Sequence, residues 1–196
     1  YMQYNNQLVL TGVLDDVGEY LRENVDKSYR LGLELDATLF LSDQFSLNSN
    51  LAVSRNKIQD LTIDRDGSLQ NLGDTNIAFS PDLITTHVFE YSPNSKFRAA
   101  LIGKYVGEQY MSNTDTEASK LDSYFVMDFN FSYDVPFETI FKSIVFTGMV
   151  NNLLDLEYVD RGYTYLDTWS APTVSEVQGY YPQATRNFLA GVTLTF

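Results

Sequence analysis

The chain has 196 residues and a formal net charge of −13, an acidic balance that argues against a nucleic-acid binder, which needs a basic face. The absence of cysteine excludes disulfides, thiolate metal sites and cysteine nucleophiles. Hydrophobic residues make up 44% of the chain, so the composition does not indicate disorder. No apolar run reaches the ~18 residues of a transmembrane helix. A strand that crosses a membrane, however, exposes only alternate residues to lipid.

The first residues already alternate, with Met2, Tyr4, Leu8 and Leu10 on one face and Gln3, Asn5 and Gln7 on the other. This period of two indicates a strand. A chain normally begins before its first strand, so we expect the N-terminal part of a longer protein to be missing here. The acidic residues 11–27 that follow are expected to form an irregular loop.

Residues 29–41 form a long amphipathic pattern. Leucines recur at alternate positions from Leu31 onward, while Arg30, Glu34 and Asp36 lie on the opposite face. The predicted strand is about twice as long as the ~5–6 residues usual in globular proteins. It is close to the ~9–11 residues that a tilted strand needs to cross a bilayer.

Similar patterns predict strands at residues 45–54, 82–91, 97–110, 121–134, 144–150 and 186–196. The facing of residues 82–91 is ambiguous, because Leu83, Phe89 and Tyr91 compete with Ile84 and Val88.

The connections between these strands alternate in length. The short ones are residues 42–44, 92–96 and 135–142, and the long ones are residues 11–27, 57–81, 111–120 and 156–185. Short turns at one end and long loops at the other are typical of an outer-membrane barrel. The sequence therefore predicts an all-β fold, a transmembrane antiparallel β-barrel segment of about eight long strands.

Two motifs near the C-terminus resemble those of TonB-dependent outer-membrane receptors. Asn151–Asp155 with Tyr158 resembles their N-N-L-F-D-x-x-Y box, with Leu154 where phenylalanine is commoner. Tyr181–Gln183 and then Arg186–Phe188 resemble the approach to their last strand.

The closing strand also resembles the family's C-terminal signal, which the barrel-assembly machinery reads. Gly191, Leu194 and Phe196 fit that signal. Alternate apolar residues of this strand are expected to face lipid: Phe188, Ala190, Val192, Leu194 and Phe196.

The resemblance implies a barrel of about 22 strands whose lumen holds an N-terminal plug. Residues 1–196 would be the C-terminal part of that barrel domain, without the plug. It implies uptake of a scarce nutrient in the outer membrane of a Gram-negative bacterium, the ligand being siderophore-bound iron, cobalamin or an oligosaccharide-like molecule. The implied partners are outer-membrane lipid and lipopolysaccharide, the plug, TonB, the barrel-assembly machinery and the small nutrient ligand.

The last long loop offers candidate ligand-binding residues: Arg161, Tyr163, Tyr165 and Trp169. Aromatic rings and an arginine could hold a ligand by stacking and charge-assisted hydrogen bonds. An interfacial aromatic girdle with loop packing is the alternative, since Tyr158, Tyr180 and Tyr181 lie near strand ends.

The charged residues of the predicted strands are expected to line the lumen and pack against the plug. They are Arg30, Glu34, Asp36, Arg98, Lys104, Glu108 and Asp128. Alternatively, they simply face water there.

Catalytic and metal chemistry has little support in the sequence. His87 is the only histidine, so a triad or zinc site would need other kinds of partner. Residues 64–67, which read Asp-Arg-Asp-Gly, together with Asp74 lack the acidic spacing of a calcium loop and indicate a solvated turn. We expect no enzyme activity, cofactor or metal. Two alternatives to the receptor stay open: a self-contained eight-stranded structural barrel, and an outer-membrane enzyme that uses His87.

Overall fold

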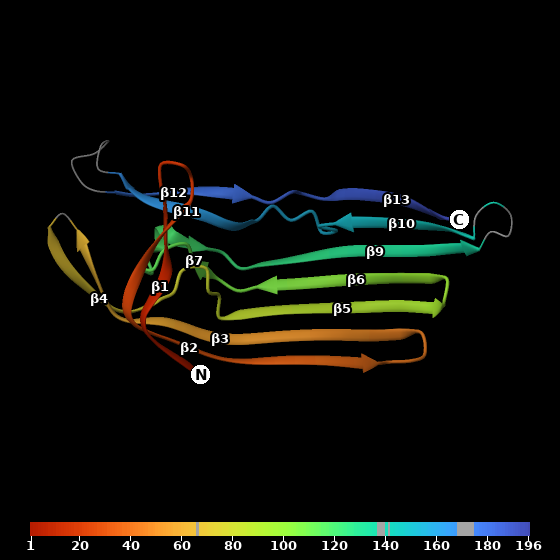
Figure 1. Cartoon of the computed structure of the whole chain (residues 1–196), viewed down its shortest axis with the longest axis horizontal. Helices are drawn as coiled ribbons and strands as arrows, with labels where there is room; N and C mark the ends of the chain where they lie inside the picture. Colours follow the sequence, from red (N-terminus) through yellow and green to blue (C-terminus); the bar gives the residue numbers. More distant parts are fainter. Residues whose placement is uncertain (66, 137–139, 141, 168–174) are drawn as a thin grey trace.

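The computed structural model describes residues 1–65, 67–136, 140, 142–167 and 175–196. Eight of its strands follow one another in one antiparallel sheet, in the order β1-β2-β3-β5-β6-β9-β10-β13. Figure 1 shows most of them side by side along the long axis of the molecule. This confirms the all-β antiparallel segment that the sequence predicts. The described sheet is open, with β1 and β13 at its two edges.

The eight strands of this path are β1 (Met2–Leu14), β2 (Tyr20–Phe40), β3 (Phe45–Arg65), β5 (Leu83–Asn94), β6 (Phe97–Val106), β9 (Tyr124–Pro136), β10 (Ser143–Asn151) and β13 (Asn187–Thr195). The other elements are β4 (Ser68–Asn76), which pairs with β3, the pairs β7 (Gln109–Tyr110) with β8 (Lys120–Leu121) and β11 (Val159–Asp167) with β12 (Ser175–Pro182), and the 3-10 turn η1 (Glu117–Ser119). Among the described residues, no helix is long and apolar enough to cross a membrane.

Short turns join β2 to β3 and β5 to β6 at the end of the sheet drawn on the right of Figure 1. The Oγ of Ser42 accepts hydrogen bonds from the backbone N–H of Gln44 and Phe45, each at 3.2 Å. In the same way, Oδ1 of Asn94 accepts from the N–H of Lys96 at 2.9 Å. Polar side chains thus close these turns locally, as turn composition predicts. The long connections lie at the opposite end, which we call the outer end.

The outer connections are more regular than the sequence predicts, and three expected loops are wrong in extent. Residues 11–27 belong largely to β1 and β2, and only residues 15–19 separate them. Residues 57–81 contain the end of β3 and all of β4, and residues 156–185 contain β11 and β12. Here both faces of a hairpin lie outside the apolar belt, so the alternation of hydrophobic residues disappears while backbone pairing continues.

The expected strand at residues 97–110 is too long, because β6 ends at Val106. The next residue, Gly107, donates its backbone N–H to the carbonyl of Leu83 at 2.8 Å. This bond extends the β5–β6 pairing by one residue, and residues 109–110 then pair with β8 instead of with β5.

Strand register gathers the apolar side chains on one face. One row of partners runs across seven strands: Leu39, Leu47, Phe89, Leu101, Phe129, Val150 and Phe188. Because Phe89 belongs to this row, Leu83 and Tyr91 share its face, and Ile84 and Val88 lie on the other. This settles the facing of β5. We call this row, together with the parallel rows of apolar side chains on the same face, the apolar belt.

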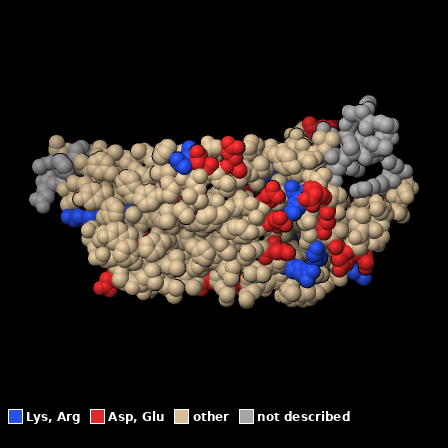
Figure 2. Space-filling view, turned by 180° about the vertical axis from the view of Figure 1, so that it is seen from behind, with Lys and Arg blue, Asp and Glu red and all other residues tan. Residues whose placement is uncertain are grey.

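Charged side chains gather toward one end of the face seen in Figure 2, and most of the elongated middle is free of them. On the face opposite the belt, polar side chains pair across strands. Asn50 donates from Nδ2 to Oδ1 of Asp36 at 2.7 Å, and Thr38 donates to Oδ1 of Asn48 at 2.7 Å. This second face is called the polar face.

The buried apolar core lies toward the outer end and not in the belt. Val9, Val25, Ile58, Leu61 and Ile77, from β1 to β3 and the residue after β4, form its buried cluster. The leucines of the belt on β2 are, by contrast, between 49% and 61% exposed.

Candidate functional site

The motif at residues 151–158 forms a hydrogen-bonded turn at the outer end of β10. Asn152 is 5% exposed and has a left-handed φ of 51°. Its side-chain amide donates to the carbonyls of Leu156 (2.8 Å) and Ala184 (3.2 Å), and its Oδ1 accepts from the N–H of Leu156. Its backbone N–H donates to Oδ1 of Asp128 on β9 at 2.8 Å. Asparagine suits this position because it tolerates the left-handed region and carries both donors and an acceptor.

The second motif binds the same turn from the approach to β13. Arg186 donates its backbone N–H to Oδ1 of Asp155 (2.9 Å) and its Nε to the carbonyl of Leu153 (3.1 Å). Asn151 donates from Nδ2 to Oδ1 of Asn187 at 2.8 Å. We call Asn151–Asp155 together with Arg186 and Asn187 the clasp. The clasp joins β9, β10 and β13, so the two sequence motifs are one structural unit.

The base of the β11–β12 hairpin is closed next to the clasp. Gln183 donates its backbone N–H to the carbonyl of Tyr158 (3.0 Å) and its Nε2 to Oδ1 of Asp160 (2.7 Å). The Nε of Arg161 lies 3.4 Å from the same carboxylate oxygen. Burial raises the pKa of Tyr158 above its usual value, and the charge of Asp160 adds to this because both disfavour the tyrosinate.

Three outer connections meet at Met111, whose side chain is fully buried. A Cβ added to Gly12 would lie 2.1 Å from the carbonyl oxygen of Met111, and one added to Gly162 would lie 2.5 Å from its Sδ. The hydroxyl of Tyr20 donates to the carbonyl of Gly162 at 2.8 Å. The β1–β2 hairpin, the β11–β12 hairpin and residues 107–123 are therefore packed together, and we call this contact the Met111 junction.

Polar side chains of residues 107–123 anchor that segment to the wall. Asn113 accepts from the N–H of Ala78 (2.9 Å) and donates to the carbonyl of Leu10 (2.8 Å). The carboxylate of Asp115 accepts from the backbone and side chain of Asn76, at 2.8 and 3.0 Å.

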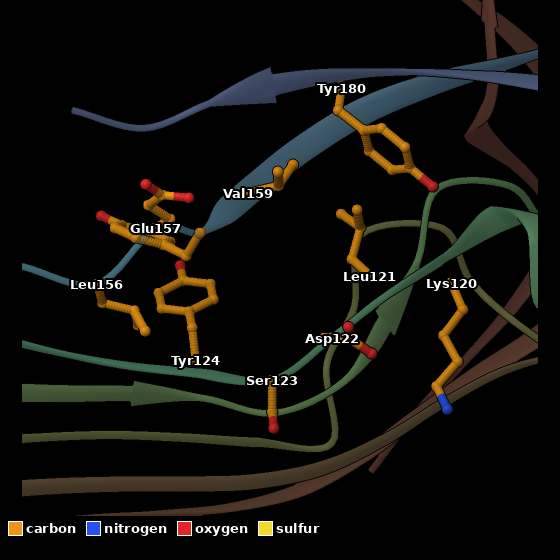
Figure 3. A pocket seen from close by; sticks show the side chains of 10 residues that line it. Lys120, Leu121, Asp122, Ser123, Tyr124, Leu156, Glu157, Val159 and Tyr180 are labelled. Atoms are coloured by element: carbon orange, nitrogen blue, oxygen red, sulfur yellow. The ribbon is translucent and has the colours of Figure 1, made fainter. Parts of the chain in front are cut away.

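A pocket of about 390 Å³ lies between residues 120–124 and the base of the β11–β12 hairpin (Figure 3). The rings of Tyr124 and Tyr158 are 4.6 Å apart with an interplanar angle of 33°. Figure 3 shows Tyr124 and Tyr180 projecting from opposite sides of the pocket. Its volume is within the ~300–1,000 Å³ of small-molecule sites.

The charged residues of the pocket are mostly acidic. Asp122 and Glu157 line it and are exposed. The Nζ of Lys120 lies 3.1 Å from Oε1 of Glu108 and 3.9 Å from Oε1 of Glu117. The hydrogen bond to Glu108 raises the pKa of Lys120 above its usual value. The lysine is thus charged but already engaged by carboxylates.

Two of the predicted ligand-binding residues, Arg161 and Tyr163, lie on β11, whose first residue lines this pocket. Arg161 is exposed, and the ring of Tyr163 lies 5.9 Å from that of Tyr181. Neither Arg161 nor Tyr163 belongs to the lining of the pocket. Tyr165 also belongs to β11, but its side chain and the whole of Trp169 lie outside the described residues.

The predicted lumen residues within the long strands share the polar face. By register these are Arg30, Glu34, Asp36, Arg98, Lys104 and Asp128. Arg98 forms an ion pair with Glu90. Glu108 differs from the rest because it lies beyond the end of β6 and pairs with Lys120.

The predicted assembly-signal residues lie at the edge of the sheet. Gly191 and Leu194 on β13 pair with Thr147 and Ile144 of β10. Phe196 follows the last residue of β13 and is 70% exposed.

Sequence reasoning missed Met111, Asn113 and Asp115, which lie in a segment expected to be a plain polar loop. No period marks them, because each contacts a distant part of the chain. The available signal was a run of hydrogen-bonding residues around one methionine, Met111–Asp115.

Comparison with known proteins agrees with this geometry. Residues 1–153 match the family model described as "TonB dependent receptor-like, beta-barrel". The siderophore receptor PiuA from Acinetobacter baumannii is similar in structure, with a TM-score of 0.65 and 16% identity over 97% of this chain and 24% of PiuA. No curated protein sequence matches this chain significantly.

Two further solved structures show the same fold. The closed form of the ferric-catecholate import receptor Fiu from E. coli K12 has a TM-score of 0.63 and 18% identity, covering 99% of this chain and 24% of Fiu. The copper transporter OprC has a TM-score of 0.63 and 18% identity, covering 97% of this chain and 27% of OprC. The chain thus spans about a quarter of the length of these receptors. Its family match, its sheet and its clasp motifs confirm the resemblance: the chain belongs to the TonB-dependent receptor β-barrel family.

Proposed function

We propose that this chain is the C-terminal part of the barrel domain of an outer-membrane receptor, which takes up a scarce nutrient through contact with TonB. The single observation that carries the proposal is the family match over residues 1–153. The continuous apolar belt supports it, because such a belt needs lipid around it. Outer-membrane lipid and lipopolysaccharide would surround the belt and the outer rim.

The polar face supports the lumen role of Arg30, Asp36 and Lys104, since it is the face away from the belt. In a closed barrel this face would contact the plug.

The outer end would receive the ligand. We propose that the ligand contacts Arg161, Tyr163 and Tyr165, because β11 begins beside the pocket. Trp169, from the same long connection, is proposed to contact the ligand as well. PiuA and Fiu are described as siderophore and ferric-catecholate receptors, and OprC as a copper transporter. Siderophore-bound iron, cobalamin and an oligosaccharide-like ligand therefore all stay candidates.

Gly191, Leu194 and Phe196 are proposed as the signal that the barrel-assembly machinery reads. Deleting Phe196 should lower the amount of receptor in the outer membrane more than it lowers ligand affinity. Immunoblots of outer-membrane fractions, alongside binding measured per receptor, check this. Normal surface levels of the deletion variant would contradict the assignment.

Uptake itself is tested in a strain that depends on the full-length receptor for growth on a limiting nutrient. Candidate nutrients are supplied singly, with and without a functional TonB. We expect growth on one nutrient to need both the receptor and TonB, while receptor abundance is unchanged when TonB is removed. Receptor-dependent growth that persists without TonB would overturn the proposal.

A further inference from the structure

The pocket of Figure 3 is lined by tyrosine rings and carboxylates, a combination that favours a particular class of chemical group. We infer that it is a subsite for an uncharged ring that carries several hydroxyl groups, such as a sugar ring. This inference rests on the proposed function and deepens it, since it names the class of group that the outer mouth recognises.

Aromatic side chains supply a stacking surface for such a ring. Tyr124 and Tyr158 are in ring contact and half-buried, so their orientations are restrained before any ligand binds. The backbone of Tyr158 is also held in place, because its carbonyl accepts a hydrogen bond from the N–H of Gln183. The C–H groups on one side of a sugar ring pack well against an aromatic face. Tyr180, which is 46% exposed, faces them across the pocket.

Carboxylates supply the hydrogen-bond acceptors that hydroxyl groups require. Asp122 and Glu157 line the pocket and are exposed, and an ionised carboxylate only accepts hydrogen bonds. A sugar has several hydroxyl donors and can satisfy both without carrying charge.

The same charges disfavour an anionic group in this pocket. Lys120 is the only cationic residue in the described lining, and Glu108 and Glu117 already lie within 4 Å of its ammonium. An anion placed there would meet two further carboxylates without a free cation to balance them.

Two sources can present this ring: a free neutral oligosaccharide, or glucose attached to a larger iron chelate. Both give the same contacts with Tyr124 and Tyr158. They differ in whether the sugar binds alone or only increases the affinity of a chelate bound elsewhere in the mouth.

The test is calorimetric titration of the full-length receptor in detergent with three probes. The probes are maltohexaose, a ferric tris-catecholate, and the same tris-catecholate carrying glucose. We expect saturable binding of maltohexaose if the source is a free oligosaccharide. If the source is a glycosylated chelate, attached glucose should raise the affinity of the tris-catecholate.

Variants of Tyr124 locate the effect. Tyr124→Ala should weaken the sugar-dependent part of binding about tenfold, whereas Tyr124→Phe keeps the ring and should change it less than about twofold. Tyr133→Ala is the matched control, because Tyr133 lies on the same strand toward the short turns. The inference is overturned if maltohexaose does not bind and glucose adds nothing to the catecholate. It is equally overturned if Tyr124→Ala changes neither.

The isosteric variants Asp122→Asn and Glu157→Gln test the acceptor role without changing shape. Each should weaken the sugar-dependent binding a few-fold. Unchanged binding in both would contradict the assigned acceptors. The proposed function can fail independently of this inference. A receptor whose uptake does not require TonB could still bind sugar through Tyr124. Conversely, TonB-dependent uptake of a plain catecholate could exist without the sugar subsite.

Discussion

The two ends of this sheet bury apolar surface in opposite ways. Toward the short turns, the leucines of β2 are about half exposed, and lipid must cover them. Toward the outer end, Val25 and Ile58 are packed inside the protein, and residues such as Asn113 and Asn152 satisfy backbone groups of distant segments. The belt half therefore depends on its solvent and the outer half on its own packing. Changes in one half should leave the other largely intact.

A charge placed in the apolar belt should have the largest effect. Leu35→Arg puts a cation on the lipid face in the middle of the apolar run Leu31–Leu41, at a cost of about 2–4 kcal/mol near the bilayer centre. Insertion into lipid vesicles, measured by urea titration, should fall accordingly. Thr38→Arg is the control on the polar face of the same strand, and the full-length receptor that carries it should insert nearly as well as the unmodified receptor. Equal losses in the two variants would refute the assignment of faces.

A methyl group at the Met111 junction should damage only the outer half. Gly12→Ala forces a Cβ against the carbonyl of Met111 and adds strain at a φ of 84°, costing about 2–3 kcal/mol locally. Hydrogen exchange should rise in the β1–β2 hairpin while insertion is normal. Gly18→Ala has a similar φ of 87° but no atom within 4 Å of its Cβ, so it isolates the strain. If Gly18→Ala loosens the hairpin as much as Gly12→Ala, the contact with Met111 is not the cause.

The clasp lies where the two halves meet. Asn152→Ala leaves the carbonyls of Leu156 and Ala184 without their donor, which should cost about 1–3 kcal/mol of unfolding free energy in urea. Asn152→Gly should recover the part due to backbone strain, because glycine accepts the left-handed region. Asn151→Ala removes only a side-chain bond to Asn187 and should cost less. The same loss from Asn151→Ala would show that the clasp is not centred on Asn152.

His87 is a polar residue within the belt, and its partner Ser49 shares that face. The register places it on the apolar face, and its Nδ1 lies 2.5 Å from Oγ of Ser49. Because lipid cannot hydrogen-bond to the ring, the double variant Ser49→Ala with His87→Leu should stabilise the inserted protein by about 1 kcal/mol or less. Urea unfolding in vesicles measures this. A large destabilisation would mean that the pair contacts something other than lipid.

The smallest effect should be a pH dependence of the outer half. Burial raises the pKa of Tyr20 above its usual 10.0, with a smaller contribution from Tyr181. The folded protein therefore keeps a proton that the unfolded chain loses, so this stabilisation is complete below pH 10 and falls as the pH rises through the raised pKa. Protease cleavage of the β1–β2 hairpin should increase as the pH rises above about 10. Tyr20→Phe should remove that part of the dependence, and an identical profile in this variant would assign it to another group.

The two faces of the sheet and the end with the short turns can be read from the sequence alone. Side chains of a strand alternate between its two faces, so the apolar residues at every second position of Leu31–Leu41 predict which face is apolar. This prediction needs no knowledge of a distant partner. Serine and asparagine at Ser42 and Asn94 close their turns through neighbours in the chain. The clasp motifs were readable as a family resemblance, but their joint role was not.

The arrangement of the outer half follows only from contacts in the folded protein. The lengths of β1 to β4, the Met111 junction and the pocket depend on contacts such as that of Tyr20 with Gly162 and that of Asn113 with Leu10, which join residues far apart in the chain. Such contacts need one partner each and impose no repeating pattern on the sequence. The facing of β5 likewise depends on its register with β3, because the residues of β5 alternate ambiguously in the sequence.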